Sequence, residues 1–358
     1  MHTVRRFYLL DALRGVAALS VVVWHWQHFY PQGAMPFHRA EQPYFWLLLP
    51  LYREGPRAVD LFFCLSGFVF HWLYGQDIAR RAISGRDFFL RRFSRLYPLH
   101  FATLIFVAAA FLAFGPHIYQ SDAYHFGLNV LLASSIGLEK GYSFNGPSWS
   151  ISVEMLLYAL FFIACRWLPS RVVACALGIA AGVALWNVHE PVARGLVSFF
   201  AGGLAYLSFA AMPRVGTLIL LRVVPLLWLA TLAQMYLAVV EMPSWVASAW
   251  TLAVLFPLTV LVLALAEAPG RPAAMSVAFL GEISYSVYLL HFPLQLVAID
   301  LHLPMQNAIA MPLFFIVLVV AAAASRRYLE RPAQEWLRRG FTTAGFAAAA
   351  RSAARAGE

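Results

Sequence analysis

The sequence predicts an all-α membrane protein, a bundle of about ten transmembrane helices with both termini in the cytoplasm. Of the 358 residues, 61% are hydrophobic and only 12% are charged. A soluble domain carries about 25% charged residues, so this composition excludes a soluble or peripheral protein. Long apolar runs recur along the chain, and most basic residues lie between alternate pairs of them.

The apolar runs are long enough to cross the hydrocarbon core as helices. Pro98 marks the predicted start of the third span. We expect residues 1–340 to form one transmembrane domain and residues 341–358 to form a mobile cytoplasmic tail. We expect no appended extracytoplasmic domain. The predicted spans are 8–29, 57–75, 97–115, 148–168, 171–187, 193–211, 217–239, 246–266, 279–299 and 306–325.

The charge pattern sets the orientation, and neither it nor the spacing of the cysteines indicates a further kind of partner. With the N-terminus in the cytoplasm, twenty Lys and Arg residues fall inside and five outside, and such an asymmetry fixes the topology of membrane proteins. The net charge of +9 is therefore topological, and we expect no nucleic-acid partner. Cys64, Cys165 and Cys175 lie in apolar runs without metal-ligand spacing, so we expect no metal.

The first span carries ionisable residues near both ends. Arg14 and His25 lie eleven positions apart, so their side chains share one helical face about 16 Å apart along the axis. Asp11 and His28 extend this stripe. Ionisable residues within a bilayer usually face a partner or a cavity, so the stripe indicates a polar path through the bundle. The alternative is a local Asp11–Arg14 pair and one interhelical hydrogen bond from His25.

The second and fourth spans carry polar side chains near their predicted outer ends. Asp60 is either a helix cap or a residue that lines the site, and Ser66 is a further candidate for lining it. Within PSWSISVEMLLY, Ser150 and Glu154 share a helical face. Because Glu154 lies at a depth similar to that of His25, we expect both in one cavity, where the carboxylate would orient the imidazole. A structural role for Glu154 is the alternative.

The ninth span contains the segment SYSVYLLHFP. We interpret His291 as a structural histidine whose hydrogen bonds are satisfied. Tyr288 precedes it by about one helical turn, and both residues remain candidates for lining the site.

The connection after the second span contains an arginine cluster. Arg91, Arg92 and Arg95 share one helical face because steps of three and four coincide. Guanidinium groups suit phosphate because each offers a fork of hydrogen-bond donors. The cluster therefore indicates a cytoplasmic site for a phosphorylated cosubstrate. The alternative is a positive anchor on anionic lipid.

These segments together resemble the acyltransferase 3 family of bacterial membrane acyltransferases. LDALRGVAALSVVVWH is similar to the opening motif of the family, and AVDLFFCLSGF, RRFSR, PSWSISVE, ISYSVYLLHFP and YLERP follow in family order from residue 9 to residue 332. Ala12 and Ala58 stand where glycine is common in the family, and Met155 where a second acidic residue is frequent.

The resemblance implies an O-acyltransferase in the bacterial inner membrane. Such an enzyme would transfer an acyl group, most often acetyl, from cytoplasmic acyl-CoA to a hydroxyl of an extracytoplasmic or membrane-associated carbohydrate. His25 would be the general base, or in a variant a covalently acylated residue, and Glu154 would orient it. Arg14 would hold the cosubstrate or stabilise the oxyanion, and the arginine cluster would bind the CoA phosphates. A transporter or flippase is the competing class, although no matching pair of broken helices is evident.

Overall fold

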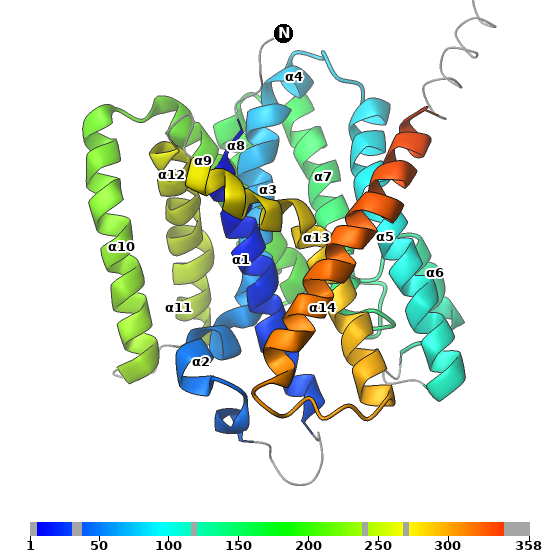
Figure 1. The fold of residues 1–358 in the computed structure, drawn as a ribbon. Coiled ribbons are helices and arrows are strands. Elements are labelled where there is room, and N and C mark those ends of the chain that lie inside the picture. The colour runs from blue at the N-terminus through cyan, green and yellow to red at the C-terminus, as the bar shows by residue number, and fades with distance from the viewer. Residues whose placement is uncertain (1–5, 31–37, 116–119, 238–242, 268–271, 340–358) are drawn as a thin grey trace, which may run out of the picture.

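A computed structural model describes residues 6–30, 38–115, 120–237, 243–267 and 272–339 (Figure 1). The regular secondary structure within these ranges is helical, as predicted, and each of the ten expected spans coincides with a helix or a run of helices. Their bounds are α1 (Tyr8–His25), α3 (Ala58–Leu73), α5 (Gly85–Phe114), α7 (Trp149–Trp167), α8 (Arg171–Leu185), α9 (Glu190–Ala211), α10 (Arg214–Leu237), α11 (Ser244–Ala249) continuing into α12 (Phe256–Ala266), α13 (Pro272–Asp300) and α14 (Ala310–Ser325).

Seven helices of the described chain are long and apolar enough, by length and composition, to cross a membrane. The connections hold three short helices, α2 (Phe45–Glu54), α4 (Gly75–Ala79) and α6 (Ala123–Val130). The predicted mobile tail, residues 341–358, lies outside the described residues.

The helix that contains the third predicted span, α5, begins thirteen residues before Pro98 and runs through this proline. Ser84 caps the helix by accepting a hydrogen bond from the backbone N–H of Asp87 at 3.1 Å. Pro98 removes one backbone hydrogen bond, a loss that helices in membrane bundles tolerate where neighbouring groups compensate. The basic segment 91–95 therefore lies on a helix that continues into the bundle.

Glycines set the closest helix contacts. Gly67 of α3 lies against the backbone of Phe199 in α9, and Gly202 of α9 lies against the backbone of Cys64 in α3. A Cβ at either glycine would overlap that backbone, so these positions need the smallest residue. Gly281 of α13 faces the backbone of Asp11 in the same way. These contacts fix α1, α3, α9 and α13 against one another in the centre of the bundle.

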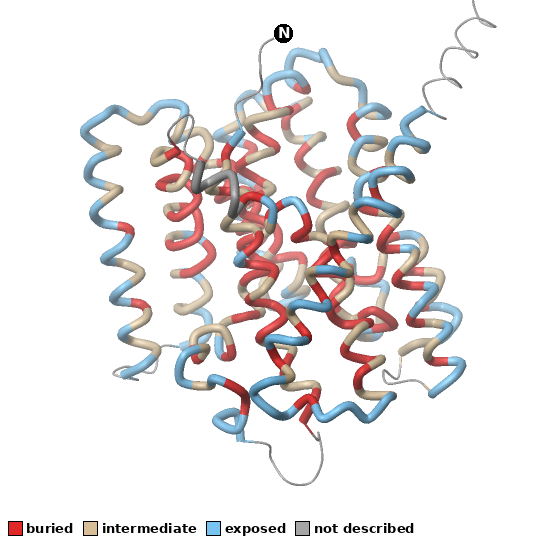
Figure 2. The backbone as a smooth tube through the Cα atoms, viewed as in Figure 1, coloured by how far each residue is buried: buried red, intermediate tan, exposed pale blue. Residues whose placement is uncertain are grey.

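The described start of α1, the short helix α4 and the end of the last helix lie at the same end of the bundle, while α2 lies at the other (Figure 1). Buried positions gather in the central helices (Figure 2). The outlying α10 buries only Val224 and Thr231, so the rest of its apolar surface is suited to lipid. The site residues lie in the central group.

Candidate active site

Two adjoining cavities lie in the central group of helices. The histidine cavity has a volume of about 810 Å³ and is lined by His25 and His28. The arginine cavity has a volume of about 90 Å³ and is lined by Arg14, Arg92 and Arg95. Val59 and Tyr288 line both cavities. The polar stripe on the first span therefore connects two spaces, with Arg14 in one and His25 in the other.

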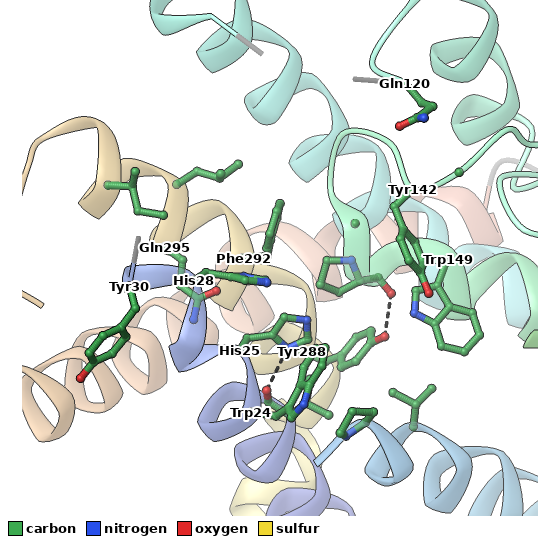
Figure 3. A pocket seen from close by; sticks show the side chains of 18 of the residues that line it. Trp24, His25, His28, Tyr30, Gln120, Tyr142, Trp149, Tyr288, Phe292 and Gln295 are labelled. Carbon is green, nitrogen blue, oxygen red and sulfur yellow. Dashed lines mark hydrogen bonds between the residues drawn. The ribbon is translucent and has the colours of Figure 1, made fainter. Parts of the chain in front are cut away.

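The histidine cavity has aromatic walls (Figure 3). α1 ends at His25 and continues as η1, a 3₁₀ turn over Trp26–Phe29, which brings His28 to the same wall. α13, which packs directly against α1, contributes Tyr288, Phe292 and Gln295, and the segment before α7 contributes Tyr142, Gly146 and Pro147. The other aromatic and polar side chains that line it are Trp24, Tyr30, Gln120, Tyr142, Trp149, Arg194, Tyr288, Phe292 and Gln295.

A backbone carbonyl orients His25. Its Nδ1 lies 2.9 Å from the carbonyl oxygen of Val21. A carbonyl oxygen only accepts hydrogen bonds, so in the neutral ring Nδ1 carries the proton and Nε2 keeps its lone pair. The His25 ring centroid lies 4.7 Å from that of His291 and 5.1 Å from that of His28. His25 therefore has the tautomer that a general base acting through Nε2 requires.

The expected contact between His25 and Glu154 is absent. Glu154 lines the arginine cavity, and its carboxylate accepts hydrogen bonds from Ser66 at 3.3 Å and from Tyr158. Similar depth along two helices does not fix the face on which a side chain lies, and α7 turns Glu154 toward α3 and α5. Glu154 interacts electrostatically with Arg14 and Arg92, so its charge compensates the guanidinium groups.

The three arginines of the predicted cluster have different surroundings. Arg92 donates a hydrogen bond to the Tyr74 hydroxyl at 2.6 Å, and its guanidinium lies 5.0 Å from the centroid of the Phe70 ring. Arg91 and Arg95 are both exposed, but only Arg95, together with the partly buried Arg92, lines the arginine cavity. The neighbouring helices therefore give the three arginines different surroundings, although all three were predicted to share one helical face.

The surroundings of Arg14 agree with both interpretations of the first span, the local ion pair and the polar path. It forms an ion pair with Asp11 at 3.4 Å, as the local alternative predicts. It also lines the arginine cavity, as the polar path predicts. Asp11 accepts a second ion pair from Arg6 at 2.9 Å, so it compensates Arg14 only in part.

The five candidates for lining the site divide into two groups. Ser66 and Ser150 line the arginine cavity, and Tyr288 lines both cavities. Tyr288 donates a hydrogen bond to the carbonyl of Pro147 at 2.6 Å, and its hydroxyl lies 2.9 Å from that of Ser150. This hydrogen-bonded tyrosine marks the junction between the cavities.

Asp60 and His291, by contrast, are fully buried and line neither cavity. Asp60 is ion-paired with Arg194 at 2.7 Å, so it does not act as a helix cap and instead holds a side chain that lines the histidine cavity. His291 uses Nδ1 to donate to the carbonyl of Tyr288 at 2.5 Å. Its buried Nε2 has no hydrogen-bond partner among the described residues, so the prediction that the hydrogen bonds of His291 are satisfied is wrong for that atom. The ring of His291 packs against that of His25.

Sequence reasoning missed Arg194 and the aromatic walls. Arg194 is the only charged residue in α9 beyond its first residue, Glu190, and its position opposite Asp60 on another apolar span was a usable signal. Trp149 lies inside the PSWS segment beside Ser150. Trp24 and Tyr142 had no spacing that separated them from the many other aromatic residues.

The described residues contain no group of three or more His, Cys, Asp or Glu side chains able to hold a metal ion.

Comparison with known proteins finds matches along most of the chain. The family described as an acyltransferase domain, acyltransferase 3, matches residues 7–326. Acyltransferase MdmB of Streptomyces mycarofaciens is 34% identical over 184 residues, which cover 49% of this chain and 44% of that protein. Protein 2 in the picA locus of Rhizobium radiobacter is 39% identical over 107 residues, covering 30% of this chain and 47% of that protein.

A more distant relative is the peptidoglycan O-acetyltransferase OatA of Listeria monocytogenes, 23% identical over 197 residues that cover 49% of this chain and 28% of that protein. The matched regions span less than half the length of each of these curated relatives. No solved structure matches the chain.

Proposed function

Because the chain belongs to the acyltransferase 3 family, we propose that it is a membrane-bound O-acyltransferase that transfers an acyl group, most simply acetyl, from cytoplasmic acyl-CoA to a carbohydrate hydroxyl outside the inner membrane. One observation carries this proposal: a cavity lined by arginines adjoins a cavity lined by histidines, and the two meet at Tyr288. A donor and an acceptor could therefore reach one point from opposite ends of the bundle.

The donor belongs on the arginine side. Arg92 and Arg95 would bind the CoA phosphates, and the pantetheine arm would pass Arg14 toward Tyr288. Guanidinium groups bind phosphate through paired, charge-assisted hydrogen bonds. The excess of basic residues at the predicted inner surface supports the cytoplasmic placement of this side.

The acceptor belongs on the histidine side. The volume of about 810 Å³ is within the range of small-molecule binding sites, which reach about 1,000 Å³. Trp24, Tyr142 and Trp149 offer flat apolar surfaces, and Gln120 and Gln295 offer hydrogen bonds. This combination suits a sugar, which has apolar ring faces and polar hydroxyls. OatA, by its name, acetylates peptidoglycan, a polymer that contains such units.

The chemistry follows from the tautomer of His25. Its Nε2 would take the proton of an acceptor hydroxyl while the hydroxyl oxygen attacks the thioester carbonyl. The new carbon–oxygen bond forms as the carbon–sulfur bond breaks, and His25 returns the proton to the CoA thiolate. Arg14 would hold the donor or stabilise the oxyanion.

The direct test uses membrane vesicles of known orientation. Acetyl-CoA labelled in the acetyl group, which does not cross membranes, should label the carbohydrate of inverted vesicles but not that of right-side-out vesicles. Labelling only in right-side-out vesicles would overturn the orientation. Movement of the carbohydrate across the membrane without any acyl transfer would instead support the transporter class.

Glu154→Gln provides a separate test of the revised role of Glu154. Removing the carboxylate takes away a negative charge that stabilises the positive charges of Arg14 and Arg92. The melting temperature should therefore fall by about 2–4 °C for each kcal/mol of unfolding free energy that is lost. Free CoA should raise it more in this variant than in the wild type, because its phosphates replace the missing negative charge.

The matched control is Glu190→Gln, which removes a carboxylate of a side chain that is 62% exposed. Thermal unfolding of purified protein with and without CoA measures both effects. A shifted pH–rate profile in Glu154→Gln, with no change in the response to CoA, would restore the role in orienting His25 that was predicted from the sequence.

A further inference from the structure

Arg326 has surroundings that the proposed reaction does not yet explain. It begins η6 (Arg326–Glu330), a π-helical turn that directly follows α14. π-helical turns are rare and occur frequently at functional sites. η6 packs against α5, the helix that carries Arg92 and Arg95.

The carboxylate next to Arg326 is largely occupied by other groups. Glu330 is 4% exposed and accepts hydrogen bonds from Ser286 at 2.6 Å and Ser325 at 2.9 Å. Its distance to Arg326 is 3.9 Å, which is longer than a charge-assisted hydrogen bond. The Nε atom of Arg326 is buried and has no hydrogen-bond partner among the described residues.

Arg326 also lies within electrostatic range of Arg95, and the two positive charges repel each other. Arg95 forms no ion pair within the described part of the chain. Arg14 and Arg92 also experience the charge of Arg95. Guanidinium groups from two helices, α1 and α5, and from the turn after α14 thus gather with too few carboxylates to balance them.

We propose that Arg326 is a further donor-binding residue, which with Arg95 binds the phosphate groups of the acyl-CoA at the mouth of the arginine cavity. The inference rests on the proposed function. An anion between the two guanidinium groups would remove their repulsion and give the buried Nε of Arg326 an acceptor. The side chain of Arg326 is 28% exposed, so a ligand from solvent can reach it.

The test compares two donors on Arg326→Gln. The KM for acetyl-CoA should rise about tenfold, the size of one charge-assisted hydrogen bond, while kcat stays close to that of the wild type. Acetyl-pantetheine, which has the thioester but no phosphate, should be used equally by the variant and the wild type. Arg326→Lys should recover part of the loss, because it keeps the charge but not the fork of donors.

The matched control is Arg327→Gln, which removes the same charge one residue away. Arg327 is exposed, and its guanidinium lies 5.4 Å from the centroid of the Tyr328 ring. Its KM for acetyl-CoA should stay within about twofold of the wild-type value, because exposed charges contribute little. Size-exclusion profiles establish that both variants fold.

Three results would overturn the inference. An equal loss with both donors would assign Arg326 a structural role. A loss that depends on the anionic lipid content of the vesicles, and not on the phosphates of the donor, would assign it to a lipid headgroup. An unchanged KM in Arg326→Gln would remove it from the site. If the wild type fails to use acetyl-CoA at all, the proposed function itself fails, which is a distinguishable outcome.

Discussion

Replacing His25 by alanine should reduce acyl transfer by about 10²–10⁴-fold, the usual contribution of a general base. The affinity for acyl-CoA should change little, because His25 lines the histidine cavity and the donor arginines line the other. The loss should therefore appear in kcat, measured by transfer of labelled acetyl to the acceptor at saturating donor. His25→Gln should not restore the rate, because an amide cannot take up a proton at neutral pH.

His38→Ala is the matched control for His25→Ala. It removes an imidazole from an exposed side chain at the edge of the described residues and should retain the wild-type rate. His291→Ala should give an intermediate loss, because its ring packs 4.7 Å from that of His25 and helps to position it. A His25→Ala protein that still acylates its acceptor at the wild-type rate would exclude His25 as the base.

The helices were predictable because each membrane span is a continuous run of apolar residues in the sequence. A run of about 20 apolar residues has few alternatives to a helix in lipid. The sequence predicted a helical face for the three arginines, but it did not predict that their helix continues through Pro98 into the third span. The serine cap at Ser84 was the better signal for the start of that helix, since Asp87 follows it three residues later.

The sequence predicted only some of the residues that line the two cavities, and it did not predict their contacts. The eleven-residue step predicted a common face for Arg14 and His25, and the two side chains line adjoining cavities. It does not show which partner each side chain has. The group that orients His25 is the carbonyl of Val21, and every residue type has a backbone carbonyl, so no sequence pattern could identify it.

Partners between helices depend on how each helix is rotated about its axis. Glu154 contacts Ser66 of α3 rather than His25 of α1, and Gly67, the residue after Ser66, packs against α9. The pair formed by Asp60 and Arg194 depends on the same packing. Buried charges of opposite sign on different spans identify such pairs once the neighbours are known.

The double substitution of Arg92 and Arg95 by glutamine should raise the KM for acyl-CoA by about 100-fold or more, since each charge-assisted hydrogen bond contributes roughly a factor of ten. Both side chains line the arginine cavity. Arg91→Gln should raise it by less than about threefold, because Arg91 is exposed like Arg95 but lies outside the cavity, where a surface charge contributes little. The three arginines, which the sequence could not separate, should therefore have unequal effects.

Steady-state kinetics with acetyl-CoA, supported by direct binding of labelled CoA, measures these effects. Arg92 also donates a hydrogen bond to Tyr74 and lies over its ring, so its loss could weaken the packing of α5. Tyr74→Phe removes the hydrogen-bond acceptor and keeps the ring and the arginine, and it should preserve the affinity for CoA. Equal effects of Arg91→Gln and Arg95→Gln would show that the cluster acts only through its summed charge, as an anchor on anionic lipid does.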